Sequence, residues 1–303
     1  MTYFAGVDGG GTKTLVSLAD AGGRELARRT GPAGLVDPRH PEATAGVVAS
    51  VVREAVREAG LDAPPAALCA GLAGVGNAAE REAVRAALAA SGVAGRVRVV
   101  TDGEIALEGA LGGGAGVLLV AGTGSVAYGR GEDGRVERCG GWGMVLGDEG
   151  SGYALGRAGL AAAMRAQDGR GPHTRLLPLL LETLGVEGPR AVPPWVGRAS
   201  KAEVAALATH VLRAAGEGDA AALSVAAHEA RELARHALAL RDRLAPWSGP
   251  VPVVFHGGVL GNPLFAGRVT AALEEEGGFA VRPPVSDAVA GALRYARALL
   301  APA

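Results

Sequence analysis

This chain of 303 residues has few of the residues that build disulfide frameworks and metal clusters. Its two cysteines, Cys69 and Cys139, are too few for a disulfide scaffold or for a four-cysteine metal site within one chain. No apolar run reaches the roughly 20 residues that a helix needs to cross a bilayer. The run from Leu176 to Leu184 is short and is interrupted by Pro178 and Glu182. These absences exclude a disulfide-rich scaffold and argue against a membrane-spanning protein.

An excess of charge of one sign is also missing. The formal net charge is −1, so nothing in the composition indicates a nucleic-acid or anionic-membrane partner. Only two of the 30 lysine and arginine residues are lysines, Lys13 and Lys201, which we attribute to genomic bias. The start of the chain lacks the basic and apolar segments of a secretory signal, which predicts a cytoplasmic protein. The length and the 49% apolar residues suit two ordinary domains.

Glycine, by contrast, is abundant, and it is concentrated near the start. An apolar run ends at Asp8, the segment Gly9–Lys13 contains three successive glycines, and a second apolar run covers Leu15–Leu18. This pattern predicts two strands joined by a glycine turn. Such a turn lets backbone N–H groups approach an anion closely, and Asp8 beside it suits a hydrated Mg²⁺. The alternative is a hairpin whose glycines serve only a positive φ.

The same pattern recurs more than a hundred residues later. The segment Gly116–Gly129 contains an apolar run, the turn Gly122–Gly124 and a second apolar run. Polar turns follow both copies, at Asp20–Gly23 and at Gly131–Gly134. Because chance turns seldom recur with the same flanks, the repeat predicts two related domains that face one another across a cleft. Two such turns can hold the phosphates of one nucleotide from opposite sides. This is the layout of the actin-like ATPase and sugar kinase superfamily, which the chain resembles at this level.

The rest of the chain alternates strands and helices before it becomes mostly helical, which predicts an α/β protein with a partly parallel sheet. We expect strands at 67–72, 97–100 and 252–255, and helices at 41–60, 80–90, 105–111, 153–167, 175–184, 201–215, 220–244 and 288–300. Asp102 comes directly after the strand that ends at Val100, and ligands bind at such strand ends in open α/β sheets. Asp102 is therefore a candidate general base for a substrate hydroxyl. The alternative is that Asp102 or Glu104 caps the following helix.

A third signal is the glycine-rich segment Cys139–Gly152, which contains Trp142, Asp148 and Glu149. Glycine at this density excludes a regular element. Trp142 offers a flat apolar face that suits a sugar ring, and the Asp148 carboxylate can accept hydrogen bonds from hydroxyls. The alternative is a strained loop in which the Trp packs in the core and Asp148 caps a helix.

Together these segments resemble the N-acetylglucosamine/glucosamine kinases of the BadF/BadG/BcrA/BcrD ATPase family. The matching segments are Asp8–Thr14, Thr101–Asp102, Ala121–Ser125, Cys139–Gly143, Gly147–Ser151, Ala166–Gly169, Pro172–Thr174, Val254–Val259 and Ser286–Ala292. The resemblance implies an α/β, two-domain actin-like (ribonuclease H-like) ATPase fold with a cleft between duplicated domains. We expect one domain at 1–110, with a C-terminal helix of about 286–303 packing back on it, and the other at 111–285.

The resemblance also implies a function, namely ATP-dependent phosphorylation of an amino sugar, most simply N-acetylglucosamine or glucosamine, by a homodimer. Asp102 would be the catalytic base and Asp8 would organise Mg²⁺. The implied nucleotide-binding residues are Gly9, Gly10, Gly11, Thr12, Lys13, Gly122, Thr123, Gly124, Gly257 and Gly258. The implied sugar-site residues are Asp102, Ser125, Gly141, Trp142, Gly143 and Asp148.

One position departs from the kinase pattern. The loop after the first hairpin, which carries a sugar-contacting Asn in these kinases, has no Asn in Gly31–Pro38; Asp37 is a possible substitute. Because one missing buried partner can change specificity greatly, the identity of the sugar stays open.

Two rival functions fit the same family. One is an ATPase activator that drives an electron-transfer partner through a cysteine-ligated iron–sulfur cluster, for which the contexts of Cys69 and Cys139 are poor. The other is a nucleotide-binding regulator without turnover, against which intact Asp8 and Asp102 argue. The cysteine count excludes the zinc-binding repressor type of sugar kinase.

Overall fold

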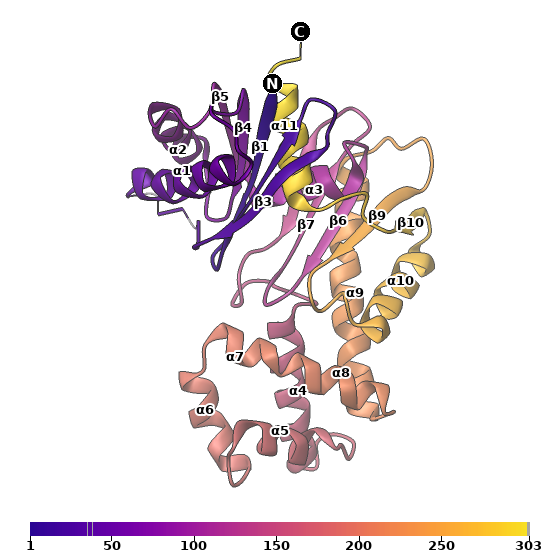
Figure 1. The fold of residues 1–303 in the computed structure, drawn as a ribbon. Helices are drawn as coiled ribbons and strands as arrows, with labels where there is room; N and C mark the ends of the chain where they lie inside the picture. Colours follow the sequence, from indigo (N-terminus) through magenta and orange to yellow (C-terminus); the bar gives the residue numbers. More distant parts are fainter. Residues whose placement is uncertain (35, 38, 302–303) are drawn as a thin grey trace. The chain divides into compact units, whose positions relative to one another are not determined.

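The computed structural model describes residues 1–34, 36–37 and 39–301. The chain divides into two compact units, Met1–Gly114 with the segment from Pro284 onward, and Ala115–Pro283 (Figure 1). Each unit is built on one five-stranded sheet. Within the described residues, no helix is both long and apolar enough to cross a membrane.

The sheet of unit 1 has the strand order β3-β2-β1-β4-β5. Strands β1, β2 and β3 are antiparallel neighbours, whereas β4 and β5 run parallel to β1. The elements are β1 (Tyr3–Gly9), β2 (Thr14–Asp20), β3 (Glu25–Gly31), α1 (Pro41–Glu58), β4 (Ala67–Leu72), α2 (Ala78–Ala90), β5 (Arg96–Thr101), α3 (Asp102–Leu111) and α11 (Ala288–Ala298).

Alternation along the strands gives this sheet two apolar faces. On β1, Tyr3 and Val7 belong to the core that α1 and α2 cover, and Phe4 belongs to the core under α3 and α11. Figure 1 shows α11, from the end of the chain, against β1 and α3. Helix α11 therefore completes unit 1.

Unit 2 repeats the arrangement with the order β10-β9-β6-β7-β8, in which β6, β7 and β8 are antiparallel and β9 and β10 parallel to β6. Because both sheets share one topology, the predicted duplication is confirmed. The strands are β6 (Gly116–Ala121), β7 (Ser125–Arg130), β8 (Val136–Gly140), β9 (Val251–His256) and β10 (Phe279–Arg282). The helices are α4 (Gly152–Gln167), α5 (Leu176–Leu184), a 3₁₀ turn (Pro189–Ala191), α6 (Val192–Arg198), α7 (Lys201–Ala206), α8 (Ala208–Gly216), α9 (Ala220–Arg243) and α10 (Pro263–Glu276).

Most predicted elements are present within a few residues of their expected ends, and the strand Ala67–Leu72 matches at both ends. Two differences are informative. The single helix expected over 201–215 is broken at Leu207 into α7 and α8. The edge strands β3, β8 and β10 were not predicted, because β3 and β8 are rich in polar residues and carry little apolar alternation, and β10 has only four residues.

Candidate functional site

Three parallel strands of unit 1 bring the glycine turn and Asp102 to one edge of the sheet. Gly9, Leu72 and Thr101 lie opposite one another across β1, β4 and β5. Neighbouring strands are about 4.8 Å apart, so Gly9 and Thr101 are separated by roughly 10 Å. On β1, Asp8 alternates onto the face that α3 covers, the same face as Phe4. Asp8, the turn and Asp102 therefore share one end of unit 1.

The glycines of the first turn are not explained by backbone strain. The predicted hairpin is present, but none of Gly9, Gly10 and Gly11 has a positive φ, so the alternative that these glycines serve only a positive φ is wrong. A Cβ on Gly11 would meet no atom within 4 Å, and one on Gly10 only the Lys13 carbonyl oxygen at 3.6 Å. The chain itself thus has room for side chains at both positions.

Asp102 is the first residue of α3 but it is not the residue that caps it. The Thr101 hydroxyl accepts a hydrogen bond from the Glu104 N–H, and the Glu104 carboxylate accepts one from the Thr101 N–H, which is a capping box. Glu104 is thereby assigned to the cap. The Asp102 side chain is exposed and accepts a hydrogen bond from the adjacent Gly103 N–H. Its carboxylate therefore lies at the strand end and is not used by the helix cap.

Two glycine contacts hold α3, and with it Asp102, against its neighbours. A Cβ on Gly71 would lie 2.4 Å from the side chain of Ile105, so β4 leaves room for α3 to pack closely. A Cβ on Gly291 of α11 would lie 2.1 Å from the carbonyl oxygen of Ile105 and 2.6 Å from the Gly109 nitrogen. The first and last parts of the chain therefore meet backbone to backbone under the candidate base.

The second glycine turn rests on the start of α4 in unit 2. The Gly122 N–H donates to the Gly124 carbonyl at 2.9 Å, and the Gly122 carbonyl accepts from the Gly152 N–H at 2.8 Å. The Thr123 carbonyl accepts from the Tyr153 N–H at 3.3 Å. Gly122 also lacks a positive φ, and a Cβ there would meet nothing within 4 Å. This turn repeats the property that marks Gly10 and Gly11.

A cavity of about 740 Å³ opens beside this turn, entirely within unit 2. Its walls are the turn and the start of α4, small residues of α7 and α8, and the segment after β9. The lining residues include Gly122, Thr123, Ala202, Ala205, Thr209, Gly258 and Asn262. Gly257 has φ +98°, and a Cβ there would lie 2.4 Å from the Ala121 carbonyl oxygen, whereas one on Gly258 would meet nothing within 4 Å. The structure thus brings Gly122 and Thr123 to the same cavity as Gly258.

Asp148 is buried in the glycine-rich loop and is held from two sides. It has φ +62°, a conformation that non-glycine residues rarely adopt. Its Oδ1 accepts a hydrogen bond from the Ser125 N–H at 3.1 Å, and its Oδ2 lies 2.6 Å from Lys201 Nζ. The Ser125 hydroxyl is also used within the loop, where it donates to the Glu149 carbonyl at 2.7 Å. These contacts order the loop that the sequence assigned to a sugar.

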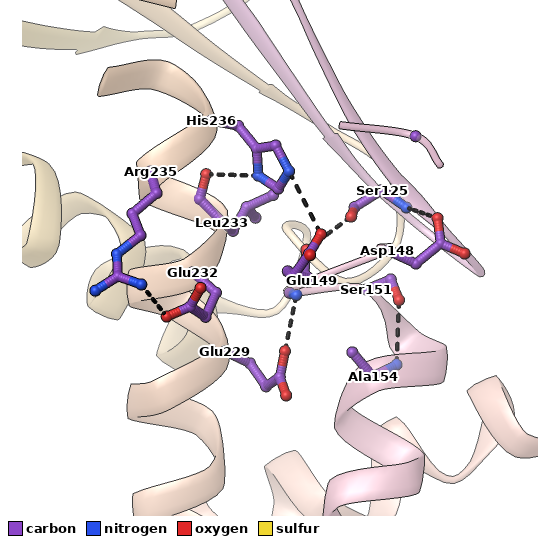
Figure 2. A network of polar contacts seen from close by, with 12 residues as sticks. Ser125, Asp148, Glu149, Ser151, Ala154, Glu229, Glu232, Leu233, Arg235 and His236 are labelled. Atoms are coloured by element: carbon purple, nitrogen blue, oxygen red, sulfur yellow. Dashed lines mark hydrogen bonds and ion pairs between the residues drawn. The ribbon is translucent and has the colours of Figure 1, made fainter. Parts of the chain in front are cut away.

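Side chains of helix α9 contact the same loop (Figure 2). The buried Glu229 carboxylate accepts a hydrogen bond from the Gly150 N–H at 2.9 Å, and burial raises the pKa of Glu229. His236 Nε2 lies 3.6 Å from the Glu149 carboxylate, and a Cβ on Gly140 would overlap this imidazole at 2.4 Å. Figure 2 shows Glu229 and His236 reaching the loop from one face of α9, about two helical turns apart.

The tip of the loop is apolar and open to solvent. Trp142 is 73% exposed, and its flanking glycines, Gly141 and Gly143, both have positive φ. Met144, Val145 and Leu146 beside it are exposed as well. The alternative in which Trp142 packs in a core is therefore wrong; its ring is open to solvent, with the Arg138 guanidinium 5.8 Å from the ring centroid.

Asp37, the possible substitute for the missing Asn, is engaged in its own turn. Its carboxylate accepts a hydrogen bond from the Arg39 N–H at 3.0 Å and lies 3.1 Å from His40 Nδ1. These contacts lower the pKa of Asp37 to about 2. Leu35 and Pro38 of this loop lie outside the described residues. The loop therefore offers no ready replacement for the Asn.

No group of three or more His, Cys, Asp or Glu side chains that could hold a metal ion occurs in the part of the chain that the structure describes. A single carboxylate such as Asp8 still fits Mg²⁺, which commonly keeps waters and binds substrate phosphates. The two cysteines are poorly placed to ligate an iron–sulfur cluster. Cys69 is fully buried in β4, where burial raises its pKa to about 12, and Cys139 belongs to β8 of the other unit.

The sequence interpretation missed three features of the site. Glu229 supports the glycine-rich loop, Lys201 pairs with Asp148, and α7 and α8 form a cavity wall. Only Lys201 had a local signal, since it is one of two lysines in an arginine-rich chain.

Comparison with known proteins identifies the family of the chain. The model of the BadF/BadG/BcrA/BcrD ATPase family matches residues 5–296. The chain belongs to this family.

Among curated relatives of this family member, an N-acetylmuramic acid/N-acetylglucosamine kinase of Clostridium acetobutylicum is 31% identical over 86% of the chain and 87% of the relative. An N-acetyl-D-glucosamine kinase of Dictyostelium discoideum is 32% identical over 63% of each chain. A crystal structure from Chromobacterium violaceum, assigned as an N-acetylglucosamine kinase, superposes with a TM-score of 0.75 at 32% identity and covers 97% of the chain and 98% of that structure. These likenesses favour the kinase interpretation over the electron-transfer activator.

Proposed function

We propose that this chain is an ATP-dependent amino-sugar kinase that transfers the γ-phosphate of ATP to a hydroxyl of N-acetylglucosamine or glucosamine. The observation that carries the proposal is the glycine placement. Gly10, Gly11, Gly122 and Gly258 have no positive φ and almost no neighbour within 4 Å, so the free chain gives no reason for them. A nucleotide bound against both turns and the cavity gives one reason for all four.

In this proposal the two turns bind phosphates through backbone N–H groups. Gly9–Lys13 and Gly122–Gly124 supply these donors with Thr12 and Thr123, and Gly257 and Gly258 approach the nucleoside in the cavity. Asp8 would hold Mg²⁺ through water, and the cation would supply positive charge to the phosphates. The cytoplasm is the expected location, and a homodimer the expected assembly.

Asp102 is the proposed general base. As the sugar hydroxyl attacks the γ-phosphorus, its proton passes to the Asp102 carboxylate, which the capping box leaves available. The sugar site is proposed to include Ser125, Gly141, Trp142, Gly143 and Asp148. Trp142 would stack on a face of the sugar ring, and ordered backbone around Asp148 would bind its hydroxyls.

The test is ADP release with Mg²⁺-ATP and a panel of glucosamine, N-acetylglucosamine, N-acetylmannosamine, N-acetylmuramic acid, hexoses and no sugar. We expect one amino sugar to stimulate release strongly. Asp102→Asn should lower kcat by about 10²–10⁴-fold and leave the Kd for ATP within about twofold, because only the proton acceptor is lost. Asp62→Asn, the same change at an exposed position of unit 1, is the control. Slow hydrolysis that no sugar stimulates, or full activity in Asp102→Asn, contradicts the proposal.

A further inference from the structure

Lys201 has no role in the predicted site, yet its ammonium lies between two parts of it. Lys201 begins α7, and the following residues Ala202 and Ala205 line the cavity. Its Nζ is 2.6 Å from Asp148 Oδ2 and 2.8 Å from the position that a Cβ on Gly124 would take. The ammonium therefore extends from the cavity wall across the second glycine turn.

The turn itself supplies no positive charge. Because the Gly122 N–H already donates to the Gly124 carbonyl, the turn offers a phosphate the N–H groups of Thr123 and Gly124 and the Thr123 hydroxyl, whereas phosphoryl transfer depends on neutralising the phosphate oxygens. A lysine ammonium is a compact charge with three donors, so it can keep one on Asp148 and offer others to an anion. The Lys201 side chain is 34% exposed, whereas that of its partner Asp148 is buried.

The use of lysine here is unusual for this chain. Of 30 lysine and arginine residues only two are lysines. Lys13 follows the glycine turn of unit 1 along the chain, and Lys201 reaches the glycine turn of unit 2 through space. Genomic bias toward arginine explains the other cations and not these two. A compact ammonium fits beside Gly124, where a Cβ already lacks room, better than a planar guanidinium.

We propose that Lys201 binds the β- or γ-phosphate of the nucleotide and, through Asp148, joins the nucleotide turn to the loop that carries Trp142. This inference rests on the proposed kinase function. The competing role is structural, in which Lys201 only neutralises the buried Asp148 carboxylate.

Calorimetric titration without sugar separates the two roles, with adenosine, ADP and a non-hydrolysable ATP analogue as probes. Lys201→Gln should raise the Kd for the ATP analogue by about 10- to 100-fold and the Kd for ADP by less. It should leave the Kd for adenosine within about twofold. Arg198→Gln, an exposed cation three residues earlier, should change none of the three. Equal losses for adenosine and the ATP analogue, or no loss for either, overturn the inference.

Lys201→Gln alone leaves the Asp148 charge buried without its cation and could destabilise the fold. The double variant Lys201→Gln/Asp148→Asn removes both charges and controls for this effect. In the Asp148→Asn background, Lys201→Gln should weaken the ATP analogue by the same factor as in the wild-type background. If Asp148→Asn restores the affinity instead, Lys201 acts only as a neutralising partner and the inference is wrong. Wild-type protein that binds no adenine nucleotide at all would refute the proposed kinase function itself.

Discussion

A single methyl group at Gly291 should move the candidate base. Gly291 lies on α11 and contacts α3, whose first residue is Asp102. Its Cβ would sit 2.1 Å from the Ile105 carbonyl oxygen and 2.6 Å from the Gly109 nitrogen. Both are backbone atoms of a helix, so neither can rotate away. Gly291→Ala therefore requires α3 and α11 to separate.

The size of the effect follows from two opposed contributions. Replacing glycine by alanine in a helix interior stabilises by about 1 kcal/mol. Overpacking costs typically about 1–3 kcal/mol, and contacts with backbone atoms belong to the upper end. We expect a net loss of about 2 kcal/mol in the free energy of unfolding, or roughly 5 °C in Tm. A displacement of α3 by about 1 Å should also lower kcat by up to about 100-fold.

Gly46→Ala is the matched control, since Gly46 lies in the interior of α1 in the same unit and a Cβ there would meet nothing within 4 Å. That variant should be more stable than wild type by about 0.5–1 kcal/mol and fully active. Thermal unfolding followed by circular dichroism measures both, and ADP release measures activity. If Gly291→Ala is as stable and as active as Gly46→Ala, the close packing of α3 on α11 is refuted.

Two further predictions concern buried titratable groups. Burial raises the pKa of Glu229 above its ordinary 4.5, so the stability it contributes is complete below that value and is lost as pH rises through the raised pKa. Glu229→Gln, whose amide oxygen can still accept the Gly150 N–H, should therefore gain Tm relative to wild type between pH 4.5 and pH 7.5; a difference that does not change with pH contradicts this. Cys69, with its pKa raised to about 12, should resist a thiol reagent at pH 8 in the native protein, whereas half-buried Cys139 should react slowly; in Cys139→Ser, rapid native labelling would show that Cys69 is not buried.

The fold was largely predictable because its signals are local. In each unit the first two strands and the glycine turn between them occupy one short stretch of sequence, Tyr3–Asp20 in unit 1 and Gly116–Arg130 in unit 2. Asp102 could be assigned to a strand end because β5 is a short apolar strand. The edge strand Glu25–Gly31 could not be found in this way, since none of its residues is buried, its exposed positions do not alternate, and it contains two adjacent arginines.

The break in the helix over 201–215 was also hidden from the sequence. Apolar spacing continues through Leu207, which is 2% exposed and joins α7 to α8 in the core of unit 2. The turn at Leu207 comes from packing against that core and from no local breaker, since neither glycine nor proline occurs between Lys201 and Ala215. Only the tertiary structure reveals that the two short helices form a cavity wall.

The difference between local and long-range signals also explains why candidate nucleotide-binding residues could be named from the sequence, whereas the side chains that support the glycine-rich loop could not. A turn that binds phosphate through its backbone must exclude side chains, and the exclusion leaves consecutive glycines in the sequence. Support by side chains leaves no such trace, because the partners come from distant elements. Glu229 reaches Gly150 across 79 residues, and Lys201 reaches Asp148 from another helix. A kinase of this kind can therefore be recognised from its glycines, while its sugar has to be identified by experiment, since side chains select it.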